Sequence, residues 1–390
     1  MIAMARSLFS ATAQRIAESL DRAFTTATLS RGGNRKRDHA QLLGMLELVS
    51  RFYDRPEYFL PDSGFFPSPA PIAPEVRRVR TFGREGDVLD LRWPSEFEPL
   101  WSDAALAGLI AESPTALDSL APGSTQRLDP HRSLREKYLR VRQNRTACAR
   151  WFRHRQGGRP CAVLLHGYMG GTFTLEERMF PVRKLFAGGM DVVLTALPFH
   201  GPRRDERRGL RPPAFPSSDP RFTIEAFRQL VLDHRALFDH LEAQGAMQIG
   251  VMGTSLGGYA SALLATLEPR LQFAVLFIPV GALDQFYFDH GAIPGEAAQQ
   301  EELRLALRRA HSVVSPGARP PVVPSERVRV IAGELDRVTG LAHSRLLADH
   351  FGVQVDTFAG GHVLQLGKTR ALEPAFAMLQ DAGLFAPPWR

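Results

Sequence analysis

Cysteine and long apolar runs are both scarce in this sequence. Only two cysteines, Cys148 and Cys161, occur among 390 residues. A small secreted scaffold held together by disulfides is therefore excluded, and a reducing compartment is favoured, so we expect a cytoplasmic protein. No stretch of eighteen consecutive apolar residues occurs, so no membrane-spanning helix is expected. The first thirty residues lack a continuous apolar core and carry several charges, so we expect no secretory signal.

Lysine is also scarce, although the chain is basic. Only four of the 48 basic residues are lysine, and the formal net charge is +7. The arginines are scattered, with dense runs at residues 31–37 and 203–208. No nucleic-acid-binding motif accompanies these runs, so we expect no nucleic-acid partner. A solvated surface is the favoured interpretation of these runs, and binding to anionic lipid or nucleic acid is the alternative. Arg203 and Arg204 could also hold an acidic group of a substrate.

The first 75 residues differ in pattern from the rest. Residues 39–53 form an amphipathic stretch, and residues 60–75 contain five prolines, which forbid a regular helix or a central strand. We therefore predict an N-terminal helical extension and proline-rich connector at residues 1–75, followed by a main domain at residues 76–390. In the extension, Ile16, Leu20 and Phe24 recur near helical spacing, which predicts a helix packed on the body of the protein. Weak peripheral membrane contact through residues 1–30 is the alternative.

The main domain begins with extended segments and continues as alternating strands and helices. Residues 76–93 resemble a hairpin, a helical insertion is expected at about 98–120, and another strand at 145–154. Short apolar runs then alternate with helical stretches. The apolar runs are residues 161–167, 191–198, 248–253, 271–280, 328–333 and 353–362, and the helical stretches are 175–187, 224–244, 256–267, 341–351 and 369–382. This alternation predicts an α/β fold with a doubly wound, mostly parallel sheet.

Polar residues follow the predicted strands. They occur in "HGYMGG", "LPFHGPRR", "GTSLGG", "PVGALDQ", "AGELDR" and "AGGH", which contain His166, His200, Ser255, Asp284, Asp336 and His362. In doubly wound sheets the site lies beyond the carboxyl ends of the strands. We therefore expect these side chains to lie close together.

The stretch "GTSLGG" matches the pattern G-x-S-x-G through Gly253, Ser255 and Gly257. An apolar run precedes it and a helical stretch follows it, which is the context of a nucleophile elbow. Glycines are needed there because the turn is so tight that side chains would collide. The serine hydroxyl then projects from the sheet at a helix N-terminus, where developing negative charge is favoured.

A serine hydroxyl needs a base to remove its proton. His362, in the loop after the last predicted strand, is the candidate base, and Asp336, just past the preceding strand, is the candidate acid that orients it. Asp284, after the fourth apolar run, is a competing acid, and Glu334 is a third choice. The chain order Ser255, Asp336, His362 matches one of the known orders of such triads.

These motifs together make residues 76–390 resemble the α/β-hydrolase superfamily. The resemblance implies a serine hydrolase (an esterase, lipase or thioesterase) without a cofactor or metal. It also implies an oxyanion hole built from the backbone N–H of Tyr168 or Met169 and that of Leu256. The segment "LPFHGPRR" departs from the usual D-x-x-G-x-G loop and resembles a less characterised group of esterase-like proteins within the superfamily.

Four further residues are candidates for substrate binding. His166 either braces its loop or contacts substrate, and His200 is expected to line the pocket. A short helical cap is predicted at about 283–324, where Phe286 and Tyr287 form either an apolar wall of the pocket or ordinary core packing. The expected substrate is a small acyl ester, thioester or lipid. Acyl transfer to another acceptor and a noncatalytic binding protein are the alternative functions, and the sequence does not determine the oligomeric state.

Overall fold

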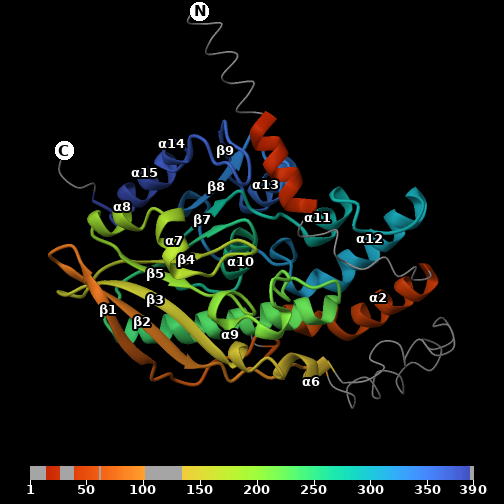
Figure 1. Ribbon diagram of the computed structural model, residues 1–390, viewed down its shortest axis with the longest axis horizontal. Coiled ribbons are helices and arrows are strands. Elements are labelled where there is room, and N and C mark those ends of the chain that lie inside the picture. The colour runs from red at the N-terminus through yellow and green to blue at the C-terminus, as the bar shows by residue number, and fades with distance from the viewer. Residues whose placement is uncertain (1–14, 27–38, 61–62, 102–133, 387–390) are drawn as a thin grey trace, which may run out of the picture.

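The computed structural model describes residues 15–26, 39–60, 63–101 and 134–386 (Figure 1). The helical insertion expected at 98–120 lies almost entirely outside these residues. Among the described residues, no helix is both long and apolar enough to cross a membrane. The bounds of the helices, besides the helical residues 15–26, are α2 His39–Tyr53, α6 Leu134–Leu139, α7 Phe173–Met179, α8 Val182–Ala187, α9 Pro220–Ala243, α10 Leu256–Leu264, α11 Leu283–Asp289, α12 Ala297–His311, α13 Gly340–Phe351, α14 Lys368–Ala371 and α15 Glu373–Asp381.

A nine-stranded sheet forms the centre of the fold, in the order β1-β2-β3-β5-β4-β6-β7-β8-β9. Strands β4 to β9 pair in parallel with one another, whereas β1, β2 and β3 are joined by antiparallel pairs and β3 pairs antiparallel with β5. The strands are β1 Glu75–Phe82, β2 Gly86–Pro94, β3 Thr146–His154, β4 Cys161–Leu165, β5 Asp191–Thr195, β6 Ile249–Thr254, β7 Leu271–Phe277, β8 Val328–Gly333 and β9 Val355–Phe358. The predicted hairpin and mostly parallel sheet are confirmed.

Two hydrophobic clusters cover the two faces of the sheet. Successive residues of β4 alternate between them: Val163 lies in the cluster with α9, α10 and α13, and Leu164 lies in the cluster with α8 and α15. Figure 1 shows α9 on one side of the sheet and α8 and α15 on the other. Because both faces are covered, the central parallel strands are mostly apolar, which is why they appear in the sequence as nearly continuous apolar runs. Cys148 and Cys161 are buried free thiols in β3 and β4.

Two predicted helices are each divided in the structure. The helix expected at 175–187 becomes α7 and α8, which are separated at Phe180 and Pro181. The helix expected at 369–382 becomes α14 and α15, and Pro374 lies in the first turn of α15. Proline has no N–H to donate to the preceding turn, so it is tolerated at the start of a helix but interrupts one that would continue through it.

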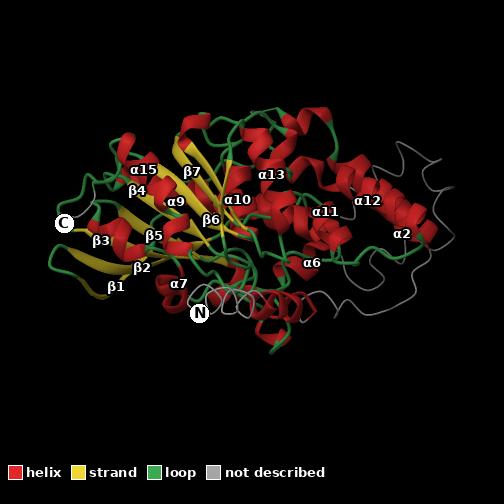
Figure 2. Ribbon diagram, turned by 90° about the horizontal axis from the view of Figure 1, so that it is seen from above, coloured by secondary structure: helices red, strands yellow, loops and turns green. Residues whose placement is uncertain are grey.

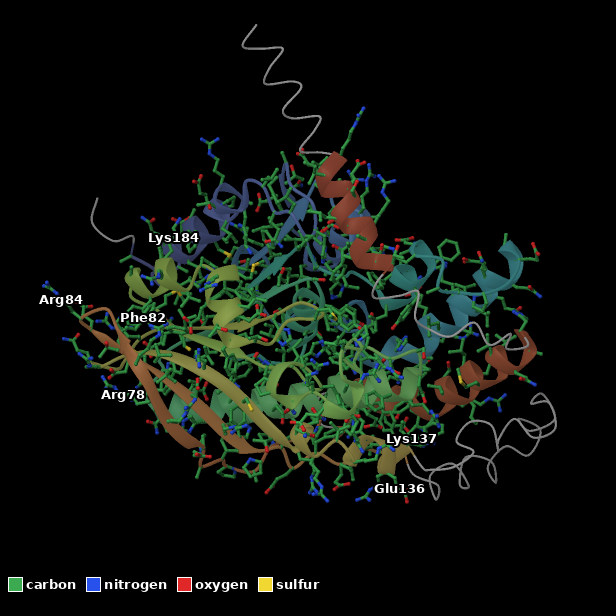
Figure 3. The ribbon with its side chains drawn as sticks, viewed as in Figure 1. Arg78, Phe82, Arg84, Glu136, Lys137 and Lys184 are labelled. Atoms are coloured by element: carbon green, nitrogen blue, oxygen red, sulfur yellow. The ribbon has the colours of Figure 1, made fainter. Side chains whose placement is uncertain are left out.

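Arginines occupy the edge of the sheet that is formed by β1. Strand β1 is exposed along seven of its eight residues, and only its last residue, Phe82, is buried. Arg78 forms an ion pair with Asp87 of β2 at 2.7 Å. Figure 3 shows the side chains of Arg78 and Arg84 directed away from the sheet. Charged side chains on an edge strand oppose pairing with a second chain.

Helix α2 packs beside α12, which lies in the predicted cap, as both Figure 1 and Figure 2 show. His39 Nε2 lies 2.7 Å from Glu302 Oε2, and Ser312 Oγ donates a hydrogen bond of 2.8 Å to Asp54 Oδ1. Phe52 of α2 belongs to the same hydrophobic cluster as the central strands. The division into an extension at 1–75 and a domain at 76–390 stays a prediction.

The helix at residues 15–26 packs on the loops that follow β8 and β9, but not through the residues that the apolar spacing indicated. Ile16 and Leu20 are 49% and 41% exposed, whereas Ala17 and Asp21 are fully buried. The expectation of an apolar buried face was therefore wrong at Ile16 and Leu20. Asp21 is buried because backbone N–H groups of the two loops bind its carboxylate.

Candidate active site

Ser255 lies in the turn between β6 and α10, at a strained backbone position. Its φ is 56° and its ψ is −116°, a region that residues with a side chain rarely adopt. Neighbouring glycines make the turn possible. A Cβ at Gly253 would collide with the carbonyl of Gly257, and a Cβ at Gly257 would collide with the carbonyls of Leu165 and His166. The turn therefore has the geometry of the predicted nucleophile elbow.

The structure brings Ser255, His362 and Asp336 into one hydrogen-bonded series. Ser255 Oγ lies 3.0 Å from His362 Nε2, and His362 Nδ1 lies 2.9 Å from Asp336 Oδ2. An ionised carboxylate only accepts, so Nδ1 carries the ring proton and the unprotonated Nε2 accepts from the serine hydroxyl. All three residues are buried, with exposed fractions of 7–8%. The series has the order and the atoms that general-base activation of a serine requires.

The Asp336 carboxylate is fixed by donors from its own loop. Its Oδ1 accepts from the backbone N–H groups of Val338 and Thr339, each at 2.8 Å, and its Oδ2 accepts from the Thr339 hydroxyl at 2.8 Å. Burial raises the pKa of Asp336, but the charge of His362 and these hydrogen bonds outweigh it, and the pKa is lowered. Asp336 therefore stays ionised and holds the imidazole in one tautomer.

His362 has a raised pKa for the complementary reason. Burial lowers the pKa of the imidazole, but the charge and hydrogen bond of Asp336 and the charge of Asp21 raise it above its ordinary value. These carboxylates stabilise the imidazolium that forms when the ring accepts a proton. The ring is thus both oriented toward Ser255 and made more basic.

Neither competing acid faces the imidazole. Asp284 forms an ion pair of 2.9 Å with Arg304 of α12, within the predicted cap. Glu334 accepts a hydrogen bond from the Thr357 hydroxyl at 3.0 Å. Of the three carboxylates considered from the sequence, only Asp336 lies within hydrogen-bonding distance of His362 among the described contacts.

The loop after β4 approaches Ser255 closely. A Cβ placed on Gly167 would lie 3.2 Å from Ser255 Cβ, so this loop borders the serine directly. Tyr168 follows, and Met169 has a φ of 70° and is 48% exposed. Leu256 is the first residue of α10, where the N–H has no carbonyl partner within the helix. The three residues predicted for an oxyanion hole thus lie beside the serine or in the adjacent loop.

His166, the first residue of that loop, and His200, in the loop after β5, have ring centroids 5.1 Å apart. His166 Nδ1 lies 2.7 Å from the carbonyl of Gly167, and its Nε2 accepts from Leu197 N–H at 3.1 Å. Burial lowers the pKa of His166 to about 4, so the ring is neutral. Both of its nitrogens are engaged, which favours the bracing interpretation over substrate contact.

His200 is fully buried, and burial also holds its pKa well below the usual value. Its Nδ1 donates to the carbonyl of Pro198 at 2.9 Å, whereas its Nε2 has no hydrogen-bond partner among the described residues. The ring lies edge-on to Tyr168, with centroids 5.8 Å apart. The expectation that His200 lines a pocket stays a prediction.

Phe286 and Tyr287 lie on α11, in the predicted cap. Phe286 packs edge-on against His290 with centroids 4.7 Å apart, and Tyr287 donates a hydrogen bond of 3.4 Å to the carbonyl of Ser217. Both residues also pack against the larger hydrophobic cluster. These contacts favour core packing, and a role as a wall for substrate stays a prediction.

Sequence reasoning missed two polar residues of this region. Asp21 binds the loop that carries His362, and Arg203 is a buried partner of Asp233 rather than a solvated charge or an anion site. The sequence carries no signal for Asp21, because Glu18 is a second acid on the same helix and the partners of Asp21 lie more than three hundred residues further along the chain. It carries none for Arg203 either, because many arginines occur in the same segment.

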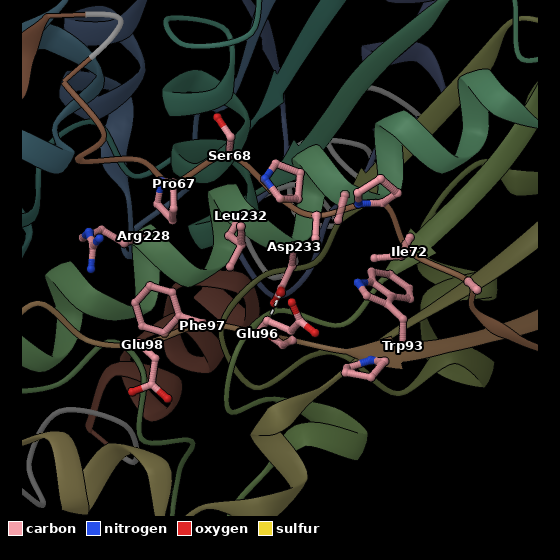
Figure 4. A pocket seen from close by; sticks show the side chains of 17 residues that line it. Pro67, Ser68, Ile72, Trp93, Glu96, Phe97, Glu98, Arg228, Leu232 and Asp233 are labelled. Atoms are coloured by element: carbon pink, nitrogen blue, oxygen red, sulfur yellow. Dashed lines mark hydrogen bonds between the residues drawn. The ribbon is translucent and has the colours of Figure 1, made fainter.

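A groove of about 460 Å³ lies elsewhere, between the proline-rich connector, the end of β2 and α9 (Figure 4). Its lining includes Trp93 and Arg228 but none of the residues predicted for the site. No group of three His, Cys, Asp or Glu side chains suited to a metal ion occurs within the described part of the chain.

The chain resembles known proteins by sequence and by structure. No protein-family model matches it. The uncharacterised protein Rv2627c of Mycobacterium tuberculosis is 28% identical over 346 residues, which cover 86% of this chain and 74% of that protein.

Two solved structures that are similar to this chain are those of acetyl xylan esterases, and both have low sequence identity to it. That of acetyl xylan esterase 1 from Thermoanaerobacterium has a TM-score of 0.50 and 14% identity, and covers 85% of this chain and 93% of the other. That from Paenibacillus sp. R4 has a TM-score of 0.47 and 15% identity, with 81% and 90% covered. With its mostly parallel sheet, covered on both faces by helices, and its serine in a strand–turn–helix elbow, this chain has the fold of the α/β-hydrolase superfamily.

Proposed function

We propose that the protein is a serine hydrolase that cleaves a carboxylic ester or thioester through an acyl-enzyme on Ser255. One observation carries the proposal: the series Ser255 Oγ to His362 Nε2 at 3.0 Å and His362 Nδ1 to Asp336 Oδ2 at 2.9 Å. The similar fold of acetyl xylan esterase 1, which by its name cleaves an ester, agrees with this reaction class.

In the proposed reaction, Ser255 Oγ forms a bond to the acyl carbonyl carbon as its proton passes to His362 Nε2. The carbonyl oxygen becomes an oxyanion, which the N–H groups of Leu256 and Tyr168, or Met169, would stabilise. Each such donor is worth about 10²–10³-fold in turnover. The imidazolium then gives its proton to the leaving alcohol or thiol as the acyl–oxygen or acyl–sulfur bond breaks.

The second half of the reaction releases the acid. Water attacks the acyl-enzyme carbonyl and passes a proton to His362, which returns it to Ser255 Oγ as the ester bond to the serine breaks. Asp336 stays ionised throughout and stabilises the imidazolium in both halves. No cofactor takes part in this scheme, and the substrate is proposed to be a small acyl ester or lipid.

A panel of nitrophenyl esters of rising acyl chain length tests the proposal, with Ser255→Ala as the matched control. We expect turnover by the unaltered chain, covalent labelling by a fluorophosphonate, and loss of both in the Ser255→Ala variant. Turnover that survives in the variant would contradict the proposal.

Two other results would change the assignment. Transfer of the acyl group to added alcohols in preference to water would identify an acyltransferase that uses the same residues. A folded chain that is neither labelled nor active would instead support a noncatalytic binding protein.

A further inference from the structure

The Asp21 carboxylate joins the helix at residues 15–26 to both loops of the candidate site. Its Oδ2 accepts from the backbone N–H of His362 at 3.0 Å and from that of Arg337 at 3.0 Å, and its Oδ1 accepts from the N–H of Val363 at 2.9 Å. Figure 1 shows this helix, in red, beside β8, β9 and α13. One side chain thus binds the loop of the candidate base and the residue next to the candidate acid.

The fit between the helix and the loop is close. Asp21 and Ala17 are fully buried. A Cβ placed on Gly361 would lie 3.1 Å from Asp21 Oδ2 and 3.2 Å from Ala17 Cβ, so the absence of a side chain at 361 allows the helix to reach the loop. The ring of Phe24, one turn further along, lies 6.1 Å from the His362 ring between centroids.

A buried carboxylate is costly unless donors surround it, and three backbone N–H groups supply that compensation here. The dependence is mutual, because removal of the carboxylate would leave those N–H groups without the acceptor that they now have. The Asp21 carboxylate is therefore one of the contacts that hold the loop bearing His362 in position.

We propose that Asp21 is a positioning residue that sets the placement and the basicity of His362 toward Ser255. This proposal rests on the proposed function for its effect on turnover. The residue touches no reacting atom and acts through the loop. Its contribution comes from the N-terminal helix, far from Ser255, Asp336 and His362 in sequence.

The charged groups around His362 come from two elements. Asp336 lies in the loop after β8, and Asp21 lies on the helix at 15–26. Arg337 and Glu18 form a more exposed ion pair with each other at 2.8 Å. The charge of Asp21 is one of the causes that raise the pKa of His362. Its removal should therefore lower that pKa and move the acidic limb of the activity profile to lower pH.

The test compares Asp21→Asn with Glu18→Gln in the full chain. Both variants remove one negative charge from the same helix, but only the first removes a carboxylate bound to the His362 loop. For nitrophenyl acetate hydrolysis by Asp21→Asn we expect kcat to fall about 10- to 100-fold with KM within about threefold, because a small misplacement of the base acts on the transition state. Glu18→Gln should keep kcat within about threefold. A normal kcat and an unmoved acidic limb in a folded Asp21→Asn protein would overturn the proposal.

A second readout does not need activity. The His362 imidazole resonance is assigned by its loss in His362→Gln and titrated by NMR in each protein. A lower pKa in Asp21→Asn than in the unaltered chain, with no change in Glu18→Gln, supports the positioning role even if the chain hydrolyses no ester. An identical His362 titration in all three proteins overturns it. The NMR titration therefore distinguishes failure of this inference from failure of the proposed function.

If Asp21→Asn does not fold, Asp21→Glu replaces it, because glutamate keeps the charge and both acceptor oxygens on a longer stem. The acidic limb should then stay in place while kcat falls at least about threefold, since only the geometry changes. Unaltered kcat in a folded Asp21→Glu protein would contradict a positioning role.

Discussion

The ion pair of Arg203 and Asp233 is expected to contribute to the stability of the fold near the candidate site. Arg203, in the loop after β5, lies 2.7 Å from Asp233 of α9, and the two side chains are 1% and 5% exposed. Arg203 also donates to the carbonyls of Ala196 at 3.2 Å and Asn144 at 3.0 Å, and Asp233 accepts from Ser95 Oγ at 2.6 Å. The pair joins the His200 loop to the helix that covers one face of the sheet.

Arg203→Met keeps most of the side-chain volume and removes the charge and the donors. Asp233 would then be a buried carboxylate with the Ser95 hydroxyl as its remaining donor. Breaking one partner of a buried pair costs about 3–5 kcal/mol in the free energy of unfolding. Arg207 supplies the matched control: it pairs with Asp205 at 2.8 Å, but its side chain is 52% exposed, and Arg207→Met should cost less than about 1 kcal/mol.

Urea unfolding of the full chain measures both variants. Burial raises the pKa of Asp233 and the charge of Arg203 lowers it, so removing the arginine raises the pKa further. A carboxyl with a raised pKa is neutral at low pH, and the loss of stability in Arg203→Met should therefore shrink as the pH falls from 8 toward 5. A loss below about 1 kcal/mol at pH 8, similar to that of Arg207→Met, would refute the reasoning.

Three further results are expected. In a pH-rate profile, the acidic limb of kcat/KM should have its midpoint above the usual histidine pKa of about 6.5, because the pKa of His362 is raised and the ring must be neutral to act as a base. A midpoint at or below about 6.5 would contradict this. Asp336→Asn should lower kcat by about 10⁴-fold in the ester assay, whereas Asp284→Asn should leave it within about tenfold, and the reverse order would make Asp284 the acid. Gly257→Ala should destabilise the chain by about 3 kcal/mol in urea unfolding, because its Cβ would collide with the Leu165 carbonyl, and an unchanged midpoint would argue against that contact.

The sequence predicts the central part of this molecule well, because the determinants there are local. Covered parallel strands are continuous apolar runs, and β4, β6 and β8 lie where such runs occur. The elbow is visible for the same reason, since only small residues fit at Gly253 and Gly257. Because parallel strands end at one edge of a sheet, the placement of the polar residues after them also follows from the pattern.

Contacts between distant segments are not visible in this way. Nothing in residues 15–26 indicates that Asp21, rather than Ile16, faces the protein, because its three N–H partners lie more than three hundred residues further along the chain. The Arg203–Asp233 pair likewise joins two separate segments, the loop after β5 and α9, and no local pattern indicates that they meet. Buried polar contacts depend on which backbone groups tertiary packing leaves without a partner, and hydropathy patterns do not carry that information.

Ser255 and His362 owe their positions to different parts of the fold. Ser255 is held within the sheet: its N–H donates to the Phe277 carbonyl of β7 at 3.0 Å, and its carbonyl accepts from Val280 at 3.3 Å. Its backbone strain, about 1–3 kcal/mol, persists because this packing leaves the turn no room to relax. The imidazole instead depends on a loop whose backbone N–H groups bind Asp21 of an N-terminal helix. Movement of that helix would therefore change the orientation and basicity of His362 while leaving the serine in place.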